Sequence, residues 1–160
     1  MGISNIRGDF GAVTGTVEFD GTDVTKAKVN ATVRVDSITT RVAKRDEHLK
    51  TDDFLDAVNH PTMTFVSTSI TQAGPGKYRM TGDLTIRGTT KSVTFDLDAP
   101  SGPVTANGGV RMGAAATGTI NRKDFGIKYH EVLDNGVLGV ADEVFINLDI
   151  EMTPRRAGTD

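Results

Sequence analysis

The sequence predicts an all-β protein, an extended antiparallel barrel with a short helical insertion. Three observations lead to this fold class. Apolar and polar residues alternate with a period of two over most of the chain, as in strands that bury one face. Turn-forming pairs and 18 glycines separate these runs. One long stretch, Arg41–His60, breaks the alternation.

Five runs alternate regularly and two are weaker candidates for strands. The regular apolar series begin at Val13, Val29, Tyr78, Val93 and Val144, the candidates cover Thr62–Ile70 and Val110–Ile120, and the series from Tyr78 is interrupted in phase by Gly82. Strands of about ten residues extend for roughly 30 Å. Closing such strands into a barrel removes their exposed edges, so we expect a barrel rather than an open sheet.

Turn signals separate the runs. They are Asp20-Gly21, Gly74–Gly76, Arg87–Thr90, Pro100–Pro103, Asn107–Gly109 and Asp134–Gly136. Arg87–Thr90 is short enough to join two strands as a hairpin. The turns divide the chain regularly, so we expect one domain over residues 1–153, followed by a polar tail over 154–160.

The stretch Arg41–His60 carries apolar residues at mixed helical spacing. Thr51–Asp53 resembles a helix N-cap before Phe54, and His60-Pro61 ends the pattern. We therefore expect two short helical turns here. Because Leu49, Phe54 and Leu55 need an apolar surface to cover, we expect this segment to cap or gate one end of the barrel.

Composition excludes several function classes. The net charge of −3 is spread without a basic stripe, which argues against nucleic acid as a partner. No cysteine is present, so disulfides and thiolate metal sites are excluded. No apolar run is long enough for stable membrane insertion as a helix. The first residues do not form a signal peptide, which leaves the cytoplasm, or the periplasm after removal of a leader.

Small residues dominate the inward positions, and this leaves two interpretations open. A barrel of about eight strands is either just filled by its side chains or holds one small ligand. Shared phase within the strands predicts which side chains face the interior: Val33, Val35, Phe65, Leu84, Ile86, Phe95, Ile146 and Leu148. Periodicity alone does not choose between a hollow and a filled barrel.

Residues with reactive side chains do not form a recognisable catalytic or metal motif. The three histidines, His48, His60 and His130, are too widely spaced for a compact zinc site. Acidic residues between Asp46 and Asp56 are typical of solvated helix faces and caps. We therefore expect no metal, no cofactor and no catalytic residue. Arg122 either contacts a ligand head group or forms a bracing pair with Asp124, and Arg45 has the same two options with an acidic neighbour.

Four ordered segments resemble the YceI family of bacterial lipocalin-like proteins. They are Asn5–Phe10 with Gly15-Thr16-Val17, Arg45–Asp56 with His60–Phe65, Gly82–Lys91, and Ile120–Ile127. Each match is loose, but together they cover essentially the whole chain. The family's usual first strand, with an Asp-x-x-His-Ser pattern ahead of the segment matching Met1–Phe10, is absent from this sequence.

The resemblance implies a barrel whose interior binds a long isoprenoid lipid, of the polyprenyl phosphate or quinone type, and carries or sequesters it. The ligand-binding residues would be Val33, Val35, Leu49, Phe54, Phe65, Leu84, Ile86, Phe95, Phe125, Ile146 and Leu148, with Arg122 at the head group. An enzyme acting on a hydrophobic substrate, and a filled-barrel stress-related interaction protein, remain alternatives. The absent strand predicts an unpaired edge near Arg7–Val17, closed either by a homodimer or by Val144–Met152.

Overall fold

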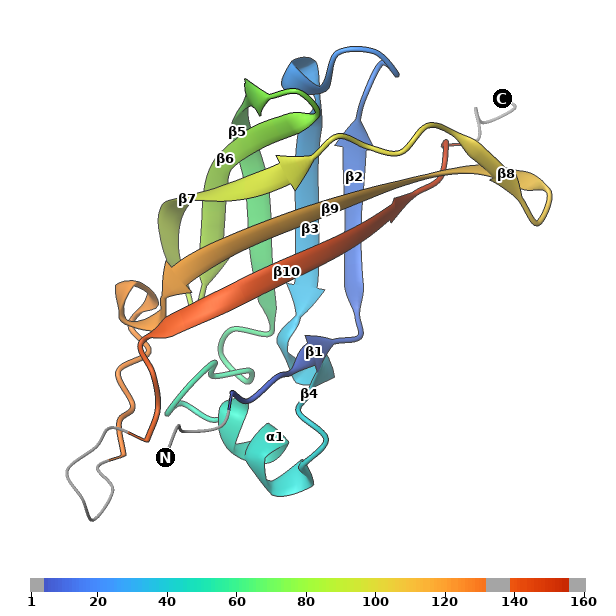
Figure 1. The fold of residues 1–160 in the computed structure, drawn as a ribbon. Coiled ribbons are helices and arrows are strands. Elements are labelled where there is room, and N and C mark those ends of the chain that lie inside the picture. Colours follow the sequence, from blue (N-terminus) through green and yellow to red (C-terminus); the bar gives the residue numbers. More distant parts are fainter. Residues whose placement is uncertain (1–4, 132–138, 156–160) are drawn as a thin grey trace.

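The computed structural model describes residues 5–131 and 139–155, and its fold is all-β. Figure 1 shows a strongly curved antiparallel sheet with one short α-helix at one end. The strands are β1 (Asp9–Phe10), β2 (Val13–Glu18), β3 (Lys28–Arg34), β4 (Ile38–Thr39), β5 (Thr62–Gly74), β6 (Lys77–Ile86), β7 (Thr89–Asp98), β8 (Val104–Ala106), β9 (Gly109–Asn121) and β10 (Glu143–Met152). The helices are α1 (Ala43–Leu49) and the 3₁₀ turns η1 (Val24–Lys26), η2 (Val35–Ser37) and η3 (Arg122–Phe125).

The main sheet has the strand order β10-β9-β7-β6-β5-β3-β2, with β8 paired to β9 and a separate β1–β4 pair. The sheet curls so that β10 passes in front of β3 and β2 in the view of Figure 1. The two ends of this order, β2 and β10, form no ladder with each other. The expectation that Val144–Met152 would pair with the first edge is therefore wrong. In the described chain β10 forms a ladder only with β9.

Two tight hairpins follow from positive backbone angles at their turns. Arg87 and Gly88 have φ of 50° and 74°, and Asn107 and Gly108 have φ of 50° and 76°. Two successive positive φ values define a type I′ turn, whose twist matches that of the flanking strands. The β6–β7 hairpin was predicted from Arg87–Thr90, whereas Asn107–Gly109 was predicted only as a turn. The turn signal at Asp134–Gly136 lies outside the described residues.

The insertion contains one helix rather than two. Helix α1 ends at Leu49, and the following residues fold back on it as turns. The backbone N–H of Leu55 donates to the carbonyl of Leu49, and that of Ala57 donates to Lys50. Asp56 has a φ of 48°, which a continuing helix does not tolerate. These two hydrogen bonds close the segment onto the end of α1, while the N–H groups of Phe54 and His60 close single turns within it by donating to Thr51 and Asp56.

The centre of the core is a pair of phenylalanines fitted over two glycines. The rings of Phe65 on β5 and Phe95 on β7 meet edge to face, with centroids 5.3 Å apart. A Cβ atom on Gly82 would lie 2.5 Å from the Phe65 ring, and one on Gly118 would lie 2.6 Å from the Phe95 ring. Gly82 thus continues the inward series of β6 and is buried. The interpretation of Gly82 as an interruption of phase is wrong, because the glycine makes room for a ring.

Candidate ligand-binding site

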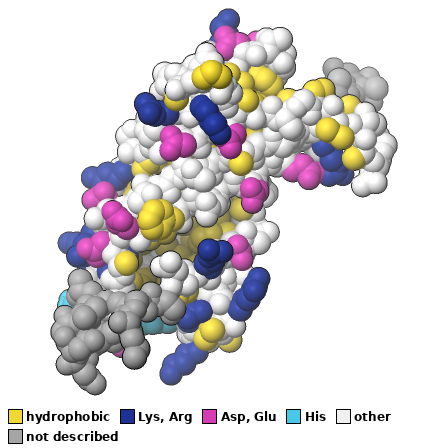
Figure 2. Space-filling model, in the orientation of Figure 1, with side chains coloured by type: hydrophobic (Ala, Val, Ile, Leu, Met, Phe, Trp, Pro, Cys, Tyr) yellow, Lys and Arg dark blue, Asp and Glu magenta, His cyan; other side chains and the backbone are white. Residues whose placement is uncertain are grey.

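The two edge strands leave the apolar interior accessible along one side. We call this side the seam, meaning the inward residues of β2 (Val13, Val17) and of β10 (Val144, Ile146, Leu148, Ile150, Met152). Val13 is 55% exposed and Val144 is 40% exposed, although both lie on the inward face of their strands. Figure 2 shows hydrophobic side chains lining a hollow between β10 and the α1 end, with basic side chains at its rim. The seam is therefore a route from solvent to the core.

A small apolar pocket lies where the C-terminal ends of β2 and β10 approach each other. It is lined by Val17, Phe19, Val24, Ala27, Val29, Ile70, Met80, Leu97, Pro100, Ala114, Ile150 and Met152. Its cavity volume is about 30 Å³, which is room for little more than water-sized molecules. A long ligand would have to extend along the seam or displace side chains. Sequence reasoning did not identify these lining residues as a site, although the alternation of apolar residues places most of them on the inward face.

The predicted interior residues are buried or half-buried. Val35, Phe65, Leu84, Ile86, Phe95 and Phe125 are buried, whereas Val33, Leu49, Phe54, Ile146 and Leu148 are partly accessible. The structure therefore divides the predicted ligand-binding set into two groups. The buried group forms the packed core, and Ile146 and Leu148 of the second group lie on the seam. Contact of any of them with a ligand stays a prediction.

The insertion covers one end of the core, as expected. Phe54, Leu55 and Ala57 pack against the buried cluster. Phe54 also forms an aromatic group with His48 and Tyr129, with ring centroids 4.8 to 5.1 Å apart. The Nε2 atom of His48 lies 2.8 Å from a carboxylate oxygen of Asp53. His48 thus packs against Phe54 and Tyr129 and hydrogen-bonds to Asp53.

A polar contact network fixes the start of the insertion. One carboxylate oxygen of Asp46 accepts hydrogen bonds from the backbone N–H and the hydroxyl of Thr40, at 2.7 and 2.5 Å. The hydroxyl contact is the main reason why the pKa of Asp46 is held below its ordinary value. The guanidinium of Arg45 donates to the hydroxyl and carbonyl of the same threonine. Arg45 therefore braces the chain through Thr40 and forms no ion pair in the described contacts.

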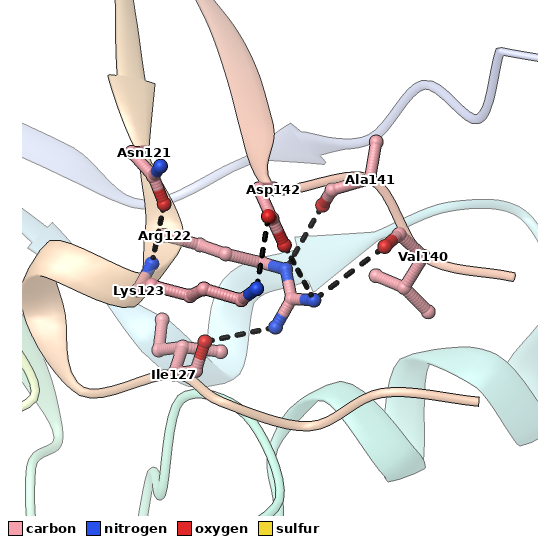
Figure 3. A network of polar contacts seen from close by, with 7 residues as sticks. All are labelled: Asn121, Arg122, Lys123, Ile127, Val140, Ala141 and Asp142. Carbon is pink, nitrogen blue, oxygen red and sulfur yellow. Dashed lines mark hydrogen bonds and ion pairs between the residues drawn. The ribbon is translucent and has the colours of Figure 1, made fainter. Parts of the chain in front are cut away.

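Arg122 is buried and its guanidinium binds the protein itself. Nε donates to the carbonyl of Ala141 at 2.9 Å, and Nη1 donates to the carbonyl of Ile127 at 2.8 Å (Figure 3). Nη2 lies 3.3 Å from the carboxylate of Asp142. The side chain is 6% exposed. This geometry favours bracing, but the acidic partner is Asp142 and not Asp124, because the register of β9 and β10 places Asp142 opposite Arg122. A contact of Arg122 with a head group stays a prediction.

The described residues hold no group of three or more His, Asp or Glu side chains placed to bind a metal ion. Their buried side-chain polar atoms all have hydrogen-bond partners. Over the same residues, no helix has the length and hydropathy required to cross a bilayer. The interior thus presents apolar surface and satisfied polar groups.

Comparison with known protein families identifies the family of this chain. The model of the YceI-like domain matches residues 1–152. The chain belongs to the YceI family. Its relative YceI from Escherichia coli O157:H7 is 40% identical over 128 residues, which are 80% of this chain and 66% of the relative. The UPF0312 protein VPA0850 of Vibrio parahaemolyticus is 34% identical over 94% of this chain and 76% of the relative.

Solved structures agree with the family assignment. The YCEI protein of Campylobacter jejuni superposes with a TM-score of 0.82 at 28% identity, covering 98% of this chain and 89% of that protein. A polyisoprenoid binding domain from Saccharophagus degradans superposes with a TM-score of 0.62 at 12% identity, covering 92% and 85%. The latter similarity shows a shared fold. The all-β, lipocalin-like architecture predicted from the sequence is confirmed.

Proposed function

We propose that this YceI-family chain binds one long isoprenoid chain along its seam and interior, and carries or sequesters it. The proposal rests on the inward apolar side chains of β2 and β10. Side chains such as Val13 and Val144 are exposed to solvent although they lie on the inward face of their strands. Exposed apolar surface of this kind usually serves binding. The structural neighbour named for polyisoprenoid binding has the same fold, which supports this class of ligand.

Energetics favour an isoprenoid tail over a polar ligand. Each methylene-sized group moved from water into an apolar site contributes about 0.8 kcal/mol. A tail of several isoprene units therefore needs few polar contacts. We propose a polyprenyl phosphate or a quinone as the ligand, with the tail in the seam and the head group near the basic rim between β10 and the α1 end (Figure 2).

The small cavity supports a second candidate, a filled-barrel interaction protein with no lipid ligand. A volume of about 30 Å³ does not hold an isoprenoid tail without rearrangement. Mass spectrometry of organic extracts of natively purified protein distinguishes the two functions. The lipid-binding proposal expects stoichiometric isoprenoid, and its absence together with no binding of added quinones would favour the filled barrel.

A matched pair of variants on β9 sharpens this test. Ala114 lines the pocket, whereas its neighbour Ala115 pairs with Asp149 and points to the outer face. Ala114→Phe should fill the pocket and weaken binding of a series of quinones, most strongly those with the longest tails. Ala115→Phe should leave binding unchanged. Equal affinities for both variants, measured by fluorescence titration, would contradict an interior site.

Head-group recognition needs its own comparison. A polyprenyl phosphate and the corresponding neutral polyprenol share a tail and differ in charge. If Arg122 contacts the phosphate, Arg122→Lys should reduce the preference for the phosphate over the alcohol. If the arginine acts only as a brace, the variant should lower thermal stability and leave that preference unchanged.

A further inference from the structure

Two aromatic rings divide the interior of the protein. The rings of Phe65 on β5 and Phe95 on β7 meet edge to face, and both side chains are buried. A Cβ atom on Gly82 of β6 would lie 2.5 Å from the Phe65 ring, and one on Gly118 of β9 would lie 2.6 Å from the Phe95 ring. The two rings together therefore cover the inner surface from β6 to β9. They separate an insertion side, next to α1, from a far side, next to η1.

The insertion side is closely packed, whereas free space lies beyond the rings. The β6–β7 turn belongs to the insertion side, because the Arg87 guanidinium donates to the carbonyl of Phe54 at 3.0 Å. Along β6 from this turn, the buried Leu84 comes before Gly82, and Met80 comes after it and lines the small apolar pocket. Every residue that lines this pocket lies on the far side. The pocket and the basic rim between β10 and the α1 end (Figure 2) are thus on opposite sides of the rings.

Of the two rings, Phe95 belongs to the less constrained backbone. The strand segment that carries Phe65 is paired on both of its sides, with β3 and with β6. Phe95 is paired with β6, but the two-residue ladder of β7 with β9 stops short of it. Its ring therefore lies over Gly118 without a ladder between the two backbones at that level. Gly118 pairs in turn with Ile146 of the seam, so the Phe95 ring lies beside the path proposed for a lipid tail.

We propose that Phe95 is a gate that sets which tail lengths the protein binds. This inference rests on the lipid-binding function proposed above. A short tail lies against the seam on the insertion side and leaves the ring over Gly118. A long tail turns the ring aside and fills both the place of the ring and the pocket of the far side.

Opening the gate breaks the aromatic pair with Phe65 and moves the Phe95 side chain from its rotamer, and both changes are unfavourable. Only a tail that continues into the far side buries enough apolar surface to offset them. A tail of intermediate length meets the ring without filling the pocket, so its additional isoprene units contribute nothing. The gate thus favours long-tailed quinones or polyprenyl phosphates over those of intermediate length.

The probes are ubiquinones that differ only in the number of isoprene units, partitioned between liposomes and the full chain. For the unmodified protein, affinity should rise with tail length, stay constant over intermediate lengths, and rise again. Phe95→Leu keeps an apolar side chain and removes the ring. It should strengthen binding of intermediate tails by about tenfold and leave the shortest tail unaffected. Phe145→Leu makes the same substitution on the outer face of β10, where the ring is 74% exposed, and should match the unmodified protein throughout.

Ring carbon NMR of the unmodified protein, labelled at phenylalanine, tests the gate even if Phe95→Leu folds poorly. The Phe95 signal should stay in place with the shortest quinone and shift with the longest. If the longest quinone binds without moving this signal, or if Phe95→Leu and the unmodified protein have the same smooth dependence on tail length, the gate is overturned and the lipid-binding function stands. If no quinone or polyprenyl phosphate of any length binds, the proposed function fails and the gate fails with it.

Discussion

The wall formed by β5, β6 and β7 and the seam formed by β2 and β10 have the same alternating pattern but different burial. On the wall, Phe95 is 3% exposed and Met80 is 2% exposed. On the seam, Val13 is 55% exposed from an equivalent inward position. Alternation therefore identifies the face of a strand, whereas burial depends on whether another strand lies beside it and another side chain across from it. Three predictions test this difference and a fourth tests the insertion, from the largest expected effect to the smallest.

Phe95→Ala should cause the largest loss of stability. The ring is buried against Phe65 and over Gly118, so its removal leaves a cavity in a rigid part of the wall. We expect the free energy of unfolding to fall by about 3–5 kcal/mol. Urea denaturation followed by circular dichroism measures this change. A loss below about 1 kcal/mol would mean that the wall is loosely packed and resembles the seam.

Gly118→Ala should destabilise the protein by about 1–3 kcal/mol, because the new methyl group overlaps the Phe95 ring. Gly113→Ala on the same strand is the control. The nearest atom to a Cβ at Gly113 is 3.7 Å away, which is an ordinary contact. Thermal denaturation of the two variants should therefore separate them clearly. Similar melting temperatures would argue that the ring moves freely.

Leu148→Ala, on the seam, should cost only about 1–2 kcal/mol without ligand, since the side chain is already partly exposed. The neighbouring Asp149→Ala, on the outer face, should have almost no effect. If a lipid occupies the seam, the difference between these variants should increase when lipid is added, because Leu148 then becomes fully buried. Calorimetry with and without a quinone measures both states, and an unchanged difference would place the ligand elsewhere.

Thr40→Val should give the smallest loss of stability, present at neutral pH and vanishing at low pH. The Thr40 hydroxyl lowers the pKa of Asp46 in the folded protein, so this contact stabilises the fold above the unfolded pKa of Asp46. The stabilisation is lost as pH falls through the folded pKa. The variant should raise the pKa of Asp46, which carboxyl carbon NMR shifts report. The control is Thr39→Val. The Thr39 hydroxyl accepts from the N–H of Arg41 and does not contact Asp46 in the described hydrogen bonds, so this variant should leave the pKa of Asp46 unchanged.

Local sequence patterns predicted most of the strands and turns of the fold. Alternation located the long strands, the Arg87-Gly88 pair located a hairpin and the Asn107-Gly108 pair located a turn, because these signals act between neighbouring residues. The failures concern contacts between distant residues. The residues after Leu49 form isolated turns that also hydrogen-bond back to the end of α1, in place of a second regular helical segment. The partner of Arg122 is 20 residues away in Asp142. Such partners depend on how strands are placed in space, which local periodicity does not encode.

The sequence predicted which side chains of the candidate site face inward, but it did not predict which of them are accessible to solvent. Ile146 and Leu148 were identified as inward-facing, but so was Phe95, which is sealed in the wall. What separates them is the strand order, which leaves β10 at an edge. Gly82 shows the same limit, since a glycine gives no hydrophobic signal even where a neighbouring ring fills its position.

The type I′ turn at Arg87-Gly88 also has a consequence for the order of folding. It joins β6 and β7 with only two residues between them, so their ten paired positions form at the lowest loop-closure entropy. Joining β3 to β5 requires closure of the whole segment 35–61. We expect the β6–β7 hairpin to be structured in the folding transition state, and the β3–β5 pair to form late. Substitutions at Leu84 should then slow folding, whereas substitutions at Val33 should mainly accelerate unfolding.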